Sequence, residues 1–151
     1  MEGARPATPD DLGHLARLAA AARAEVAGRR GGDLWARREA RRPPLAALLD
    51  DPAARLVVGT LDGVPTGYGL LRIETLEEPP PLARIVELYV EPPARAVGVG
   101  EAIVEALHTE AVAVGCGGID AFALPGDRAT KNFFETHGFV ARLLVMHRPL
   151  P

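Results

Sequence analysis

The stretch that decides this fold reads Leu88-Tyr89-Val90-Glu91-Pro92-Pro93-Ala94-Arg95-Ala96-Val97-Gly98-Val99-Gly100. An apolar strand runs into proline, which cannot donate a hydrogen bond to a sheet, and an Arg-x-x-Gly-x-Gly turn then leads into a helix. The first amides of a helix have no partner inside it, and the helix dipole adds positive partial charge at the same end. Glycines let an anionic group approach the backbone, and Arg95 adds a charged donor. The spacing therefore predicts a site for a phosphorylated ligand at residues 95–100.

Two other glycine-rich motifs fit this turn poorly. A dinucleotide-binding fingerprint needs a third glycine where this chain has Ile103, and it follows the first strand of its domain, whereas this turn comes late. A P-loop needs Gly-Lys-Ser or Gly-Lys-Thr, which the chain lacks. A plain strand-to-helix turn with a surface arginine stays open as the structural alternative.

The composition is that of a single globular domain over residues 1–151. Apolar residues make up 48% of the chain and charged residues 25%, and the net charge is −3. This net charge argues against a nucleic-acid binder, which usually has a basic face. Its apolar runs are shorter than the roughly 20 residues of a membrane span. We expect neither nucleic acid nor membrane among its partners.

Cysteine and histidine usage excludes further kinds of site. Cys116 is the only cysteine, so a disulfide within the chain is excluded. The four histidines lack the spacing of metal ligands, and we expect no metal. The start of the chain lacks a basic-then-apolar leader, which predicts a cytoplasmic protein. Lysine occurs only at Lys131 while arginine is abundant, which indicates GC-rich coding and a bacterial source.

Hydrophobic periodicity predicts an alternation of helices and strands after a short extended start. The predicted helices cover residues 9–27, 34–42, 45–49, 99–114 and 127–136. The predicted strands cover residues 55–61, 66–76, 83–91, 119–124 and 140–146. The Asp62-Gly63 pair predicts an antiparallel hairpin, whereas strand–helix–strand crossovers in the second half require parallel pairing. The result is an α/β fold with a mixed sheet and helices on both faces.

Four segments in this order resemble the GNAT superfamily of acyl-CoA-dependent N-acetyltransferases, and the resemblance covers essentially the whole chain. Residues 5–11 are similar to the first strand and helix start of the family, and residues 62–68 to its central hairpin. Residues 88–100 are similar to its main cofactor motif, and residues 133–139 to its last helix-to-strand signature. The resemblance implies a single GNAT-like domain whose mixed, mostly antiparallel sheet splays at the central strands, near Glu91 and Gly98.

The resemblance also implies acetyl-CoA as the acyl donor. The turn amides would hold its diphosphate, and the preceding strand would hydrogen-bond its pantetheine arm like an added strand. Near the end of the chain, Asp127 would cap the last helix and Phe134 would pack against the arm. The cofactor-binding residues implied in this way are Leu88, Tyr89, Val90, Arg95, Ala96, Val97, Gly98, Val99, Gly100, Asp127 and Phe134.

Glu87 is the candidate catalytic base. Strand alternation predicts that it shares a face with Ile85 and Tyr89. Acyl transfer to an amine needs the neutral amine, and a carboxylate beside the thioester can accept the proton. Glu74 on the neighbouring strand is the reserve candidate. A surface or salt-bridged glutamate is the structural alternative for Glu87.

Phe134 stands where many members of the family carry a tyrosine that protonates the departing thiolate. Phenylalanine has no proton to donate. Cys116 and His137 are substitutes by residue type, and structural roles are the alternative for both.

The resemblance implies an N-acetyltransferase that moves an acetyl group from acetyl-CoA to a primary amine of a small molecule or peptide. A catalytically weak acyl-CoA-binding sensor or interaction domain is the alternative, which Phe134 keeps open. A larger acyl donor such as succinyl-CoA is a third hypothesis. By analogy with the family, we also expect a homodimer that forms through the final strands.

Overall fold

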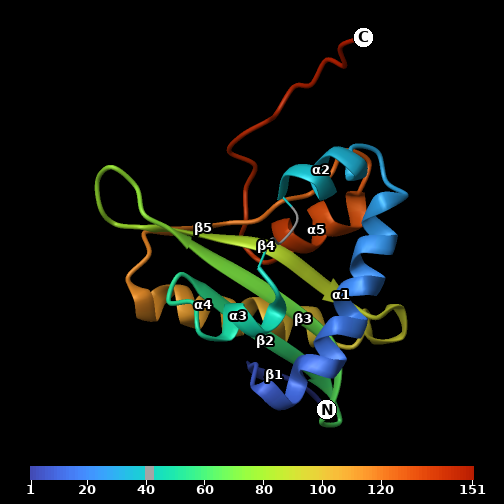
Figure 1. The fold of residues 1–151 in the computed structure, drawn as a ribbon, viewed down its shortest axis with the longest axis vertical. Helices are drawn as coiled ribbons and strands as arrows, with labels where there is room; N and C mark the ends of the chain where they lie inside the picture. The colour runs from blue at the N-terminus through green and yellow to red at the C-terminus, as the bar shows by residue number, and fades with distance from the viewer. Residues whose placement is uncertain (40–42) are drawn as a thin grey trace.

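A computed structural model describes residues 1–39 and 43–151 of the chain (Figure 1). Within these residues, five strands form one mixed sheet in the order β1-β2-β3-β4-β5. Neighbouring strands are antiparallel except β4 and β5, which are parallel. The strands are β1 Glu2–Pro6, β2 Ala54–Leu61, β3 Val64–Glu74, β4 Leu82–Val90 and β5 Gly118–Asp120. The fold is therefore the mixed, mostly antiparallel α/β domain that the sequence predicts.

Helices cover both faces of the sheet (Figure 1). One face packs against α4, which contacts β1, β2, β3 and β4, and the other face packs against α1 and α3. Helix α2 packs against α1. The helices are α1 Leu12–Ala27, preceded by a 3-10 turn Pro9–Asp11, then α2 Gly32–Glu39, α3 Leu45–Leu49, α4 Val99–Val114 and α5 Arg128–Thr136. None of the helices within the described ranges is both long and apolar enough for a membrane crossing.

Glycine allows α4 to lie directly on the sheet. A Cβ at Gly69 of β3 would lie 2.6 Å from Cγ2 of Ile103 and 2.8 Å from Cδ1 of Leu107. Both of these α4 side chains are completely buried. The close approach explains why a residue without a side chain stands within the buried stretch 68–71 of this strand. A Cβ at Gly59 of β2 would likewise lie 2.8 Å from Cγ1 of Val99, so the N-terminus of α4, where the glycine-rich turn ends, also lies close to the sheet.

A bulge in β4 changes which side chains share a face. Leu70 of β3 pairs with Glu87, but Leu71 pairs with Ile85, so Val86 is the extra residue. Glu87 therefore shares a face with Tyr89, as predicted, whereas Ile85 lies on the opposite face among the residues packed under α4. The prediction that Ile85 and Glu87 share a face was wrong, because simple alternation fails across a bulge.

Three predicted elements differ from the structure. The strand predicted at 119–124 ends at Asp120, because the following residues leave the sheet and line a cavity. The helix predicted at 34–42 is α2, and residues 40–42 lie outside the described part of the chain. The strand predicted at 140–146 is absent: residues 140–151, which the structure describes, are extended and unpaired. A β-strand needs a neighbouring strand to pair with, and none of the strands among the described residues pairs with this segment.

Asp11 connects the first strand to the first helix. Its carboxylate accepts hydrogen bonds from Arg5 Nη1 at 2.7 Å and Nη2 at 2.8 Å, and from the Thr8 amide at 2.8 Å. The Arg5 guanidinium, followed by the Thr8 amide and hydroxyl, holds the pKa of this buried carboxyl well below its usual range. A lowered pKa stabilises the fold above the unfolded pKa of about 4, and the stabilisation is lost as pH falls toward the folded value.

We expect Asp11→Asn to lower the free energy of unfolding by about 2 kcal/mol at pH 7, because charge-assisted hydrogen bonds are lost from a buried site. Arg5 is half exposed, which limits the effect. Urea unfolding at pH 7, 5 and 3 measures it. The difference between wild type and variant should shrink below pH 4, and a difference that is constant with pH would contradict the assignment.

Candidate active site

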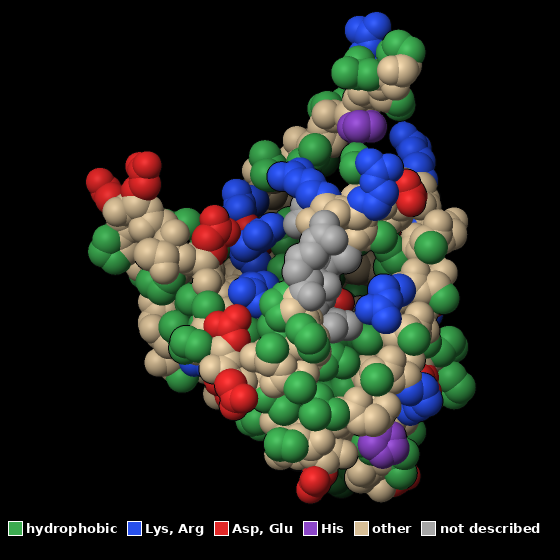
Figure 2. All heavy atoms as spheres, viewed as in Figure 1, with side chains coloured by type: hydrophobic (Ala, Val, Ile, Leu, Met, Phe, Trp, Pro, Cys, Tyr) green, Lys and Arg blue, Asp and Glu red, His purple; other side chains and the backbone are tan. Residues whose placement is uncertain are grey.

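A cavity of about 430 Å³ opens where the sheet splits. Only the first three residues of β4, Leu82 to Arg84, pair with β5, so the second half of β4 has an open edge on that side. The splay that the sequence predicts is therefore present. Helices α1 and α2 close one side of the cavity, and the segment from Phe122 to Phe134 closes the other. Figure 2 shows basic side chains around the hollow on this face, and the lining includes Arg23, Arg29 and Arg95.

The glycine-rich turn lies at one end of this cavity. Gly98 is the N-cap of α4 and has a left-handed backbone with φ +90°, a conformation that favours glycine. Among the described residues, the amides from Ala96 to Gly100 donate to no backbone acceptor. Ala96 and Val97 are exposed to solvent. The arrangement therefore presents unpaired amides and the positive end of a helix dipole.

Arg95 lies back across the end of β4. Its Nε donates to the Val90 carbonyl at 2.7 Å, and its guanidinium lies 5.5 Å from the centroid of the Tyr89 ring. Its Nη2 donates to Oε1 of Glu25 at 2.7 Å. The side chain is 40% exposed, so the charge is held in place but stays accessible to a ligand.

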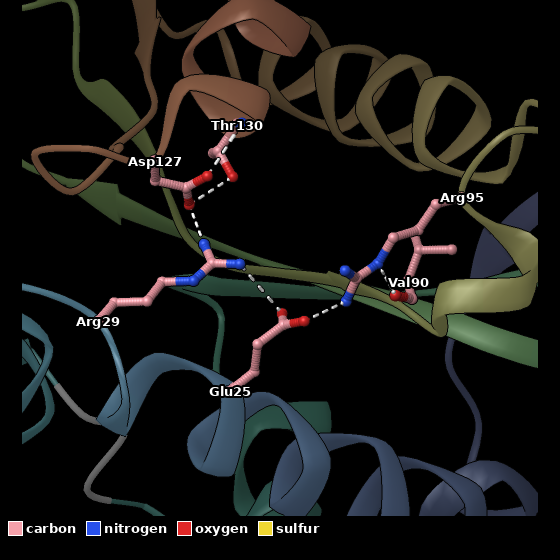
Figure 3. Close-up of polar contacts among 6 residues, drawn as sticks. All are labelled: Glu25, Arg29, Val90, Arg95, Asp127 and Thr130. Atoms are coloured by element: carbon pink, nitrogen blue, oxygen red, sulfur yellow. Dashed lines mark hydrogen bonds and ion pairs between the residues drawn. The ribbon is translucent and has the colours of Figure 1, made fainter.

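Glu25 of α1 joins Arg95 to the far wall of the cavity (Figure 3). Its other oxygen lies 3.6 Å from Nη2 of Arg29, and Arg29 in turn forms an ion pair with Asp127. Asp127 caps α5, accepting from the Thr130 amide at 3.2 Å and from its hydroxyl at 2.7 Å. A chain of alternating charges therefore runs from the glycine-rich turn to the start of α5.

Glu87 lines the same cavity from the floor. It lies on β4 two residues before Tyr89, and both side chains face α1. The reserve candidate Glu74 is elsewhere: it ends β3, is exposed, lies 3.8 Å from Nε of Arg84, and is absent from the cavity lining. The structure therefore places one of the two predicted carboxylates in the cavity and leaves the other outside.

Comparison with known proteins identifies the family. A model of the acetyltransferase (GNAT) family matches residues 18–139. The chain belongs to the GNAT acetyltransferase family. The match takes in α1 from residue 18 onward, the whole of β2 to β5, the glycine-rich turn and α5, so it includes the residues of α1 to α5 that line the cavity.

Solved structures share this GNAT fold at low sequence identity. Aminoglycoside N-acetyltransferase AAC(6')-Iy in complex with CoA is 18% identical, with 99% of this chain and 95% of that chain covered and a TM-score of 0.76. The same enzyme with a bisubstrate analogue is 17% identical, with coverages of 100% and 99% and a TM-score of 0.75. A variant of the BH1408 protein from Bacillus halodurans is 22% identical, with coverages of 98% and 99% and a TM-score of 0.80. No curated protein matches the chain.

Phe134 forms part of the wall of this GNAT cavity. It is 6% exposed and packs against Phe133 and Phe139, with ring centroids 5.4 Å and 5.1 Å away. The two residues named as substitute acids lie outside the lining: Cys116 packs on the core under α4, and Nδ1 of His137 lies 2.7 Å from the Phe133 carbonyl. The hydroxyl-bearing side chains that do line the cavity include Tyr68 and Tyr89.

Sequence reasoning missed the wall of the GNAT cavity that α1 and α2 supply. Glu25 lies in the last turn of α1 and Arg29 lies just beyond its end, four positions later. That spacing could have paired them but could not have placed them at the turn. Trp35 lies against Phe122, with ring centroids 5.2 Å apart, although 87 positions separate them in the chain. Within the described ranges, no group of three or more His, Cys, Asp or Glu side chains could hold a metal ion.

Proposed function

We propose that this GNAT protein is an N-acetyltransferase that uses acetyl-CoA to acetylate a primary amine. The observation that carries the proposal is the run of unpaired amides from Ala96 to Gly100 beside the open edge of β4, with Glu87 in the same cavity. The diphosphate of the cofactor fits the unpaired amides, and its extended, amide-containing arm fits the open edge of β4. Glu87 supplies a proton acceptor.

Each end of the cavity suits a different part of acyl-CoA. The amides at 96–100 and Arg95 would bind the diphosphate, since charge-assisted hydrogen bonds to phosphate are strong and directional. The backbone of the second half of β4, which lacks a neighbouring strand, would hydrogen-bond the pantetheine arm. Phe134 and the capped start of α5 would close the other side of the arm. Bound in this way, acyl-CoA supplies an activated thioester.

Glu87 would act as the general base. A protonated amine is not a nucleophile, so a group in the cavity has to accept a proton as the amine reacts. Glu87 is the carboxylate on the cavity floor, on the strand along which the arm would lie. Binding the thioester and the amine side by side on this strand would also speed the reaction by proximity.

The acceptor would enter from the α1–α2 side. Trp35 and Phe122 form an aromatic wall there, and the Arg84 guanidinium lies 5.1 Å from the Phe122 centroid. We therefore place amines that carry an apolar or aromatic group first in a panel. Aminoglycosides, polyamines, amino acids and peptide N-termini complete the panel, because the solved neighbours include an aminoglycoside acetyltransferase.

Two measurements test the proposal. Calorimetry and thermal melting with acetyl-CoA, succinyl-CoA and free CoA report binding, and release of free thiol across the amine panel reports transfer. Binding with turnover supports the enzyme. Tight binding with no turnover on any amine favours the acyl-CoA sensor, for which Phe134 in place of a proton donor is the supporting observation. No binding at millimolar concentration contradicts both.

Glu25→Gln should tighten CoA binding about threefold to tenfold at low salt, because a carboxylate is removed from between Arg95 and Arg29. The change also releases the Arg95 guanidinium toward the ligand. Calorimetric titration with CoA at 20 mM and 300 mM salt measures it, and screening should reduce the gain at the higher concentration.

Glu110→Gln is the matched control for this experiment. Glu110 on α4 has a similar exposure and also pairs with an arginine, Arg55 at 3.1 Å, but it lies outside the cavity lining. We expect its CoA affinity to equal that of wild type. Weaker binding by Glu25→Gln would mean that Glu25 positions Arg95 for the ligand instead of competing with it.

A further inference from the structure

The charged side chains around the cavity fall into two groups. The first group is the chain of alternating charges that runs from the glycine-rich turn to the start of α5, and its members contact one another: Arg95, Glu25, Arg29 and Asp127. In the part of the lining that the structure describes, the other charged residues are Arg23 and Glu87. One guanidinium and one carboxylate outside the chain of charges are complementary to a ligand that itself carries one positive and one negative group.

Arg23 offers an accessible positive charge. It is exposed, and none of the described carboxylates forms an ion pair with it. Glu25, which contacts Arg95, is two residues further along α1, so the side chains of Arg23 and Glu25 leave the helix on nearly opposite sides. Arg23 also lines a second hollow, between α1 and α3. The anion that suits Arg23 is therefore a group of the acceptor, whereas Arg95 and the turn amides suit the diphosphate.

An aromatic surface lies in the same cavity. Trp35 and Phe122 are half-buried, line the cavity and have ring centroids 5.2 Å apart. A flat apolar group packs well on such a surface, in the offset or edge-on contacts that aromatic rings prefer. Phe122 already holds the Arg84 guanidinium 5.1 Å from its centroid. A polycation would meet the charge of Arg23 and a ring that already binds one cation, so the surface favours an acceptor with a neutral ring.

We propose that the acceptor is an amino acid with an aromatic side chain, an inference that rests on the N-acetyltransferase function proposed above. The ring would pack on Trp35 and Phe122, and the carboxylate would pair with Arg23, whose planar fork of donors matches a carboxylate. The amine would then face Glu87. As the nitrogen bonds to the acetyl carbon, the carbon–sulfur bond breaks, CoA leaves as the thiolate, and the proton of the amine passes to Glu87.

Two pairs of amines separate the contribution of the ring from that of the charge. L-phenylalanine and its amide share the ring, but only the acid carries a carboxylate. L-phenylalanine and L-alanine share the carboxylate, but only the first has a ring. In initial rates of thiol release, the kcat/KM for L-phenylalanine should exceed that of either partner about tenfold or more, the size expected for a lost charge-assisted hydrogen bond or a lost aromatic contact. Spermidine and an aminoglycoside should react more slowly than L-phenylalanine.

Substitutions assign each preference to one residue. Arg23→Gln should remove the preference for L-phenylalanine over its amide. Trp35→Ala should remove the preference over L-alanine, and Trp35→Phe should retain most of it. The Kd for CoA should stay unchanged in all three, because neither residue belongs to the turn or to the open edge of β4. Arg30→Gln and Leu34→Ala are the matched controls: Arg30 and Leu34 are exposed and lie outside the described lining, so both preferences should persist.

Fluorescence measures binding of the acceptor without turnover. Trp35 is the only tryptophan of the chain, so its emission reports on ligands at the aromatic surface. With free CoA present, L-phenylalanine should change this emission saturably. Arg23→Gln should weaken the apparent affinity about tenfold, as the loss of one charge-assisted contact predicts.

Failure of this proposal and failure of the proposed function give different results. If L-alanine, the amide or spermidine reacts as well as L-phenylalanine, the acceptor assignment is wrong while the transferase stands. Weaker CoA binding by Arg23→Gln also overturns the assignment, since Arg23 would then bind the cofactor. Saturable binding of L-phenylalanine without turnover on any amine supports the acceptor site and counts against the transferase. Absence of both binding and turnover contradicts both proposals.

Discussion

Glu87→Gln is expected to lower kcat for amine acetylation about 100-fold or more, the usual size of a lost general base. The carboxamide keeps the shape of the side chain but cannot accept the proton of the attacking amine. Neither the glycine-rich turn nor the open edge of β4 changes, so the Kd for CoA and the KM for acetyl-CoA should stay within about twofold of wild type. Steady-state thiol release, together with calorimetric titration of CoA, separates the two effects.

Glu74→Gln provides the control for this substitution. Glu74 is also a glutamate of the sheet, but it is exposed at the end of β3 and lies outside the cavity. Its substitution should leave kcat unchanged. If Glu87→Gln retained the wild-type kcat, the base would have to be another group or solvent, and the assignment of Glu87 would fail while CoA binding still stood.

Gly98→Ala should weaken CoA binding roughly tenfold or more. Gly98 has φ +90°, and the left-handed region costs a residue with a Cβ about 1–2 kcal/mol. The added methyl group would also lie 3.1 Å from Cγ of Glu2. The backbone relaxes by rotating out of this conformation, which turns the neighbouring amides away from a common point. Since 1.4 kcal/mol corresponds to tenfold in Kd, strain of this size predicts the stated loss.

Gly115→Ala separates binding from stability in this experiment. Gly115 caps the other end of α4 with φ +89°, and a Cβ there would meet nothing within 4 Å. Both substitutions should lower the free energy of unfolding by a similar amount, about 1 kcal/mol. Only Gly98→Ala should change the Kd for CoA. Equal CoA affinities in the two variants would mean that the amides at 96–100 do not bind the diphosphate.

Local patterns in the sequence were sufficient for most of the secondary structure and for the turn. The helix over 99–114 begins and ends as predicted, because a left-handed glycine stands at each end of an apolar periodic run. The Asp62-Gly63 hairpin was equally clear: Asp62 has φ +50° and Gly63 φ +79°, as a tight two-residue turn between twisted strands requires. Both signals lie within a few residues of the feature that they predict.

The errors arose where the outcome depends on partners far away in the chain. The bulge at Val86 is a relation between two strands, so alternation along β4 alone placed Ile85 on the wrong face. The segment at 140–146 has the composition of a strand, but strand formation also needs a neighbouring strand, and none of the described strands pairs with it. Glu74 and Glu87 are both glutamates on adjacent strands, but Glu87 lines the cavity at the split between β4 and β5, whereas Glu74 is exposed at the end of β3.

By itself the sequence determined the family, the order of the elements up to α5 and the unpaired amides at residues 96–100, because caps, glycines and periodicity act over a few residues. Only the tertiary structure decided which charges meet in the cavity. Glu25, Arg95 and Asp127 are separated by 70 and 32 positions, and they join one chain of contacts through Arg29 because α1 crosses the open half of β4. Contacts of this kind depend on how the layers pack, and packing is a property of the whole chain.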